Sequence, residues 1–105
     1  MIDQKVIDEL KAANTGVKLH QLTHGEDSIV VRSPSPAIYR KARANQRDSK
    51  MALDANELFV RDCLVFPDQK TFGVLLQEQP GLAETFATSL VEIAGAVGAC
   101  EVVPL

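Results

Sequence analysis

Apolar positions recur at helical spacing through the second half of this chain. Over residues 51–95 they return every three or four positions, which is the period of one helical face. Two prolines, Pro67 and Pro80, interrupt the stretch, and proline is excluded from a helix interior. The pattern therefore predicts three helices: one over Leu53–Phe66, one over Asp68–Gln79 that Asp68 can cap, and one that starts near Leu82 and is closed by Gly95 with Gly98. The apolar stripe of the last helix consists of Leu82, Phe86, Leu90, Ile93 and Val97.

In the first half of the chain, the pattern of apolar residues changes from a helical to a strand-like period. Asp3 can cap a short helix that ends near Ala13. A ragged alternation over Val17–Thr23 and three consecutive β-branched residues within Ser28–Arg32 then predict two strands, with Gly25 in the turn between them. Because a lone hairpin is only marginally stable in water, it must lie on the helices or extend the sheet of a neighbouring molecule.

A further helix is predicted between the hairpin and residue 51. Ser35 is placed to cap it, and Pro36 occupies the first helical position, where a missing N–H costs nothing. We expect a break or kink near Asp48, since Asp48 and Ser49 are poor interior residues, although no proline or glycine enforces it.

The elements together define an α+β fold in a single domain, residues 1–105. It comprises a short N-terminal helix, a two-stranded antiparallel hairpin and three to four packed α-helices. The N-terminal helix and hairpin occupy residues 3–33, the helical part residues 35–97 and a tail residues 98–105, which is either a frayed end or a short edge strand.

Composition fits a small domain with its own core. Of 105 residues, 46 % are hydrophobic and 24 % are charged, and no apolar run approaches the roughly 20 residues that span a membrane. The start of the chain, Met1 to Gln4, contains an acid rather than a basic and apolar leader, so we expect a cytoplasmic protein. Cys63 and Cys100 have no CxxC spacing, and two readings stay open for them: buried thiols or a mutual disulfide.

The charge is unevenly distributed. The net charge is -3, but the window Arg32–Lys50 holds six basic residues against one acidic residue, a net +5. Within the expected helix, Arg40, Arg43 and Arg47 share a face at spacings of three and four, beside Tyr39. Such a face is either a solvated surface, a protein contact or, less in keeping with the acidic remainder of the chain, a phosphate contact.

The sequence contains only weak matches to catalytic, metal-binding and nucleotide-binding motifs. Serines at 28, 33 and 35 lie near His20, His24 and Asp27 in sequence, yet the glycine-framed turn of a nucleophile is missing. The two histidines are four apart in a strand and turn, where they would not converge on a metal as on a helix. No phosphate-loop or dinucleotide glycine spacing occurs. We expect no catalytic site, no cofactor and no metal.

The order of elements and several short strings resemble a known family. A strand leads into a helix that carries Tyr39-Arg40, and further short strings follow in order up to a closing helix. The strings are Val30–Ser35, Ala55–Pro67, Gln79–Leu82 and Ile93–Gly95. In this the chain resembles the small tail assembly chaperones encoded by long-tailed bacteriophages and prophages.

The resemblance implies a non-catalytic assembly factor that acts in the host cytoplasm and is absent from the finished virion. Such chaperones coat the helical tape measure protein while tail tube subunits polymerise around it, so the implied partners are the tape measure protein, the tail tube protein and other copies of the chaperone. Family members often have a longer frameshifted companion. The partner-binding surface that we expect comprises Tyr39, Arg40, Arg43, Arg47, Phe59 and Phe66.

Two other classes remain as alternatives. One is a small nucleic-acid-binding or regulatory protein that uses the basic helix 36–50, for which stacking aromatic residues are sparse. The other is a small enzyme or metal protein.

Overall fold

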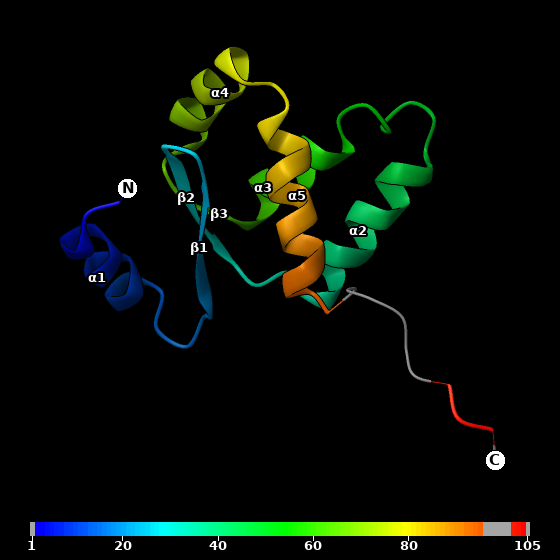
Figure 1. Cartoon of the computed structure of the whole chain (residues 1–105), viewed down its shortest axis with the longest axis horizontal. Helices are drawn as coiled ribbons and strands as arrows, with labels where there is room; N and C mark the ends of the chain where they lie inside the picture. Colours follow the sequence, from blue (N-terminus) through cyan, green and yellow to red (C-terminus); the bar gives the residue numbers. More distant parts are fainter. Residues whose placement is uncertain (1, 96–101, 105) are drawn as a thin grey trace.

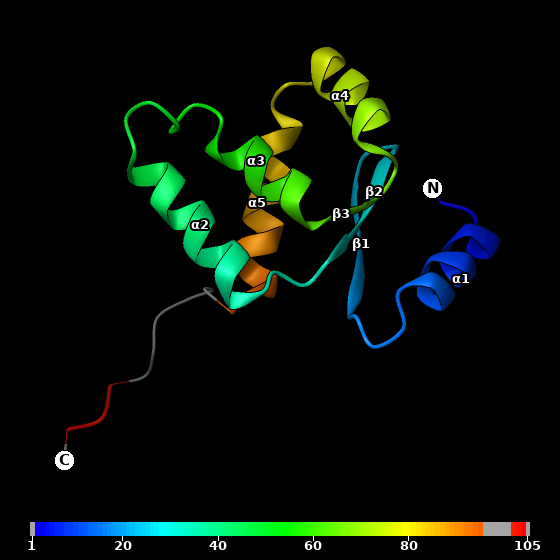
Figure 2. The same cartoon turned by 180° about the vertical axis from the view of Figure 1, so that it is seen from behind.

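A small antiparallel sheet separates one helix from the others. The computed structural model describes residues 2–95 and 102–104. Figures 1 and 2 show α1 on one side of the sheet, α2, α3 and α5 on the other side, and α4 at one end. The elements in chain order are α1 (Gln4–Ala13), β1 (Leu19–His24), β2 (Asp27–Arg32), α2 (Pro36–Arg47), α3 (Ala55–Cys63), β3 (Leu64–Phe66), α4 (Gln69–Glu78) and α5 (Leu82–Ile93). Within the described residues this is the expected α+β class, with five helices.

The sheet has the strand order β1-β2-β3, so β2 is its central strand. β1 and β2 pair without interruption from Leu19↔Arg32 to His24↔Asp27, around a turn in which Gly25 has a φ of 63°. β2 and β3 are also antiparallel, and their register shifts between Val30 and Val31. The predicted hairpin is therefore confirmed, with β1 starting two residues later than expected.

The third strand replaces the end of a predicted helix. We expected a helix over Leu53–Phe66, but α3 begins at Ala55, ends at Cys63 and passes directly into β3. The local cause is Pro67, because the residue before a proline is biased towards extended backbone, and that residue is Phe66. The long-range cause is β2, whose second edge gains hydrogen bonds from β3.

Helix starts follow the predicted caps. The side chains of Asp3, Ser35 and Asp68 accept the backbone N–H of Lys5, Ile38 and Thr71 at 3.3, 3.2 and 2.7 Å, respectively. The predicted break at Asp48 is also confirmed. Its backbone is extended, and its carboxylate accepts the Lys50 N–H at 2.9 Å in the loop before α3.

The core lies between the sheet and the larger helical layer. Alternate β2 residues, Ile29 and Val31, are completely buried against this layer, in which Leu90 of α5 is also completely buried. Other large buried side chains of the helical layer include Phe59, Val60, Phe72, Leu76, Leu82 and Phe86. Val97 and Cys100 lie outside the described residues, so neither the end of the apolar stripe nor a disulfide is tested. The described part of the tail, residues 102–104, forms no strand.

We predict that Phe72→Ala destabilises the protein by about 3–5 kcal/mol, because it removes a completely buried ring and leaves a cavity. Val74→Ala is the matched control on the same helix. Val74 is 52 % exposed, so its truncation should change the free energy of unfolding by less than about 0.5 kcal/mol. Urea titration of both variants measures the difference, and equal losses would contradict this packing.

Candidate protein-binding surface

The basic helix α2 presents one arginine face to solvent. Ala42 is 4 % exposed and faces the core, which turns Arg40, Arg43 and Arg47 outwards, all of them exposed. Arg43 donates a hydrogen bond to Gln46 Oε1 at 3.1 Å. None of these three arginines forms an ion pair within the described part of the chain. The three charges are therefore available to an acidic partner.

Lys41 differs from these arginines. Its Nζ lies 3.0 Å from Asp62 Oδ2 of α3, and both side chains are partly exposed, at 58 % and 32 %. An exposed pair of this kind contributes little stability, roughly 0–1 kcal/mol. The pair does neutralise the positive charge of Lys41, so the positively charged surface of α2 is smaller than the sequence indicated.

Tyr39 connects the arginine face with the core. Its ring is half-buried and meets the ring of Phe59 edge-on, with centroids 6.4 Å apart and an interplanar angle of 72°. Phe59 itself is only 2 % exposed. The structure thus places Phe59 behind the predicted surface and not on it, because α3 turns this position inwards.

Phe66 lies on the opposite side of the sheet from Phe59. It is half-buried in β3, opposite Val30 of the central strand. It lines an open groove together with residues of α1 and α4, among them Ile2, Val6 and Leu75. The six predicted residues therefore do not form one surface: four belong to α2, one to the core and one to the α1 side of the sheet.

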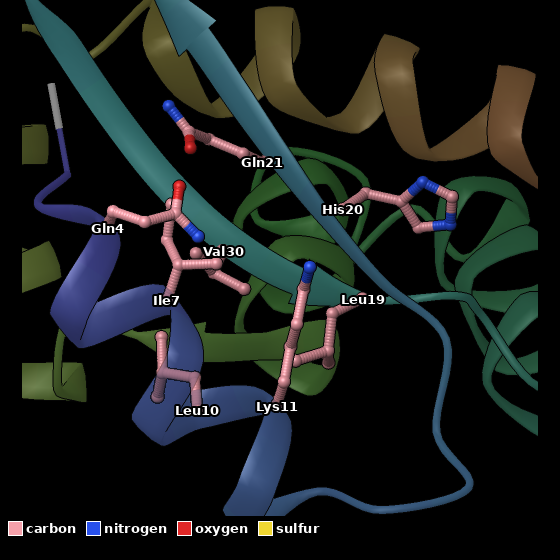
Figure 3. Close-up of a pocket in the computed structure, with 8 residues that line it drawn as sticks. All are labelled: Gln4, Ile7, Leu10, Lys11, Leu19, His20, Gln21 and Val30. Carbon is pink, nitrogen blue, oxygen red and sulfur yellow. The ribbon is translucent and has the colours of Figure 1, made fainter.

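A cavity of about 290 Å³ lies between α1 and the sheet (Figure 3). Ile7 and Leu10 of α1 face Leu19 and Val30 across it, while Gln4, Lys11 and Gln21 contribute polar atoms. No residue of α1 is fully buried, so this helix covers the sheet incompletely. Sequence reasoning missed this space, although the consecutive run Ile29-Val30-Val31 indicated a strand with two buried faces.

One pair of candidate catalytic residues does meet. His20 Nε2 lies 2.9 Å from Ser33 Oγ, across the hairpin. Asp27 lies at the other end of the hairpin and accepts a hydrogen bond from Gln79 Nε2 at 2.7 Å. Within the described residues no carboxylate is bonded to His20, so the candidates are not arranged as a triad.

The remaining predicted residues are placed as follows. Ser35 caps α2, and Ser28 Oγ lies 2.8 Å from Thr23 Oγ1. His24 is exposed beside the turn. Across residues 2–95 and 102–104, no group of three or more His, Cys, Asp or Glu side chains could hold a metal ion, and no helix is long and apolar enough to cross a membrane.

Comparison with known proteins supports the fold alone. No family model matches the chain, and no curated protein matches it. Among solved structures, the chain is similar to the uncharacterised protein rbstp2171 from Bacillus stearothermophilus, with a TM-score of 0.75 and 22 % sequence identity. The likeness covers 91 % of this chain and 98 % of that one. The architecture is thus one that a second protein adopts over nearly its whole length.

We predict that Cys63 is unreactive in the folded protein. Burial, reinforced by the neighbouring Asp62 carboxylate, raises the pKa of the Cys63 thiol to about 11, so the thiolate is scarce at neutral pH. In a Cys100→Ser variant, a thiol reagent at pH 8 should label Cys63 at least about tenfold more slowly than the same variant unfolded in urea. Equal labelling rates would contradict the burial of this side chain.

Proposed function

We propose that this protein is a non-catalytic tail assembly chaperone of a bacteriophage or prophage, which binds the tape measure protein during tail morphogenesis. The observation that carries the proposal is the arginine face of α2, which projects three charges without an intramolecular ion pair in the described structure. The partners are helical tape measure segments, the tail tube protein and other copies of the chain. The protein acts in the host cytoplasm and is not retained in the virion.

The surface suits a weak and reversible contact with a helical client. Exposed arginines pair with acidic positions of a partner helix, and each pair at a wet surface adds only about 0.2–1 kcal/mol. The loop that follows α2 adds an apolar contact point, since Leu53 is 97 % exposed. Weak contacts of this kind give useful avidity when several copies line one client, and each copy can still be displaced by tube subunits.

We predict that the triple variant Arg40→Glu, Arg43→Glu, Arg47→Glu binds a tape measure segment at least about tenfold more weakly than the parent chain. Calorimetry or fluorescence anisotropy with a labelled segment measures the change. The three positions are exposed, so the melting temperature should stay close to that of the parent.

The matched control reverses three other exposed charges, Lys5, Lys18 and Lys70, which lie outside α2. It makes the same change in net charge and should retain binding. If both triple variants bind equally, or if the parent chain ignores every tape measure segment, the proposal is wrong.

The same arginine face supports a second candidate, a regulatory protein that binds nucleic acid through residues 36–50. This function predicts submicromolar affinity for duplex DNA that falls steeply as salt is raised. The chaperone function predicts little binding to DNA, so one titration with parent chain and the α2 triple variant separates the two.

A further inference from the structure

We propose that β1 is the interface through which copies of this chain join, with its free edge paired antiparallel to β1 of a second copy. The two three-stranded sheets then form one continuous sheet. The proposal rests on the self-association included in the proposed function and assigns a surface to it.

The direction of the backbone groups along β1 follows from its pairing with β2. The Ser33 N–H donates to the Lys18 carbonyl at 3.0 Å, which makes this pair a hydrogen-bonded one. Hydrogen-bonded and open pairs alternate along an antiparallel ladder. The open pairs therefore include Leu19, Gln21 and Thr23, whose N–H and C=O groups point away from β2.

These outward backbone groups have no protein partner among residues 2–95 and 102–104. Across the described residues, no hydrogen bond joins the backbone of Leu19, Gln21 or Thr23 to another backbone or side chain outside the ladder. The same alternation directs the Val30 groups of β2 towards β3, where Val30 does pair with Phe66. Within the part of the chain that the structure describes, β1 is thus a regular edge with three donors and three acceptors unused.

The two edges of the sheet differ in how well they are protected against pairing with another strand. β3 is three residues long, its register with β2 shifts, and Pro67 follows it, which are common ways of blunting an edge. β1 is six residues long, pairs with β2 in unbroken register and contains neither proline nor lysine. Such an unguarded edge favours addition of another strand.

The composition of β1 favours a second copy as that strand. A two-fold axis through Gln21 places Leu19 opposite Thr23 of the second copy and Gln21 opposite its own equivalent. All three outward positions then form hydrogen-bonded pairs, which gives about six hydrogen bonds between the copies. β1 holds no Asp, Glu, Lys or Arg, so the pairing brings no like charges together. Gln21 is exposed, and its uncharged amide side chain lies opposite Gln21 of the second copy without charge repulsion.

The decisive variant is Gln21→Pro. Proline removes the outward N–H at the two-fold axis and keeps the ladder with β2, because that N–H makes no bond to β2. Gln21→Lys is a second variant, which keeps the N–H and places like charges face to face. Gln21→Thr is the matched control, since it changes the side chain without blocking the edge.

Light scattering after size-exclusion chromatography, at about 100 µM chain without client, measures the mass, and a melting curve verifies folding. We expect a dimer for the parent and for Gln21→Thr, and at least about tenfold weaker association for the proline and lysine variants. A monomeric parent, or association that both blocking variants preserve, overturns the proposal. A dimer that ignores tape measure segments would refute the proposed function and leave this interface intact.

Discussion

Ile29, Val30 and Val31 are buried at successive positions of the central strand β2. Successive strand residues point to opposite faces, so both faces of the sheet must be covered. Each such side chain gains about 1.5–3 kcal/mol on leaving water, which makes the covering of β2 a major source of stability in a domain of this size. The positions of the surrounding helices follow from this requirement.

The two faces of the sheet are covered to different extents. On one face Ile29 and Val31 pack into a core with fully buried side chains from α3, α4 and α5. On the other face Val30 meets α1, which has no fully buried residue and stands over a cavity of about 290 Å³. A clamp centred on Arg61 adds to the better-packed side: its guanidinium bonds Glu57 at 2.9 Å and the Gln69 carbonyl at 3.0 Å, and lies 5.4 Å from the centroid of Phe72. The molecule thus combines a firm helical layer, which carries the arginine face of α2, with a loosely held α1.

Much of this fold could be predicted because its signals are local. Caps at Asp3, Ser35 and Asp68, the turn at Gly25 and the break at Asp48 each depend on side chains within a few residues. The strand Leu64–Phe66 could not be read in this way. Its three apolar residues fit the end of a helix equally well, and pairing with β2, more than thirty residues away in sequence, decides between them.

In the candidate site, too, some features follow from local sequence and others depend on distant elements. The outward phase of Arg40, Arg43 and Arg47 follows from helical spacing and a buried Ala42. Spacing could not show that Lys41 is paired with Asp62, that Phe59 is enclosed, or that Phe66 faces α1, since each depends on the partner element. The cavity under α1 likewise results from incomplete packing between two elements, for which a linear sequence holds only the indirect sign of three consecutive β-branched residues.

Amide hydrogen exchange followed by NMR tests whether β2, buried on both faces, is the most stable part of the molecule and whether α1 is held loosely over it. We expect the amides of Ile29, Val30 and Val31 to exchange only through global unfolding, whereas those of α1 exchange through local opening at a clearly lower free energy. If α1 is protected as strongly as β2, or if β2 exchanges first, the account is contradicted.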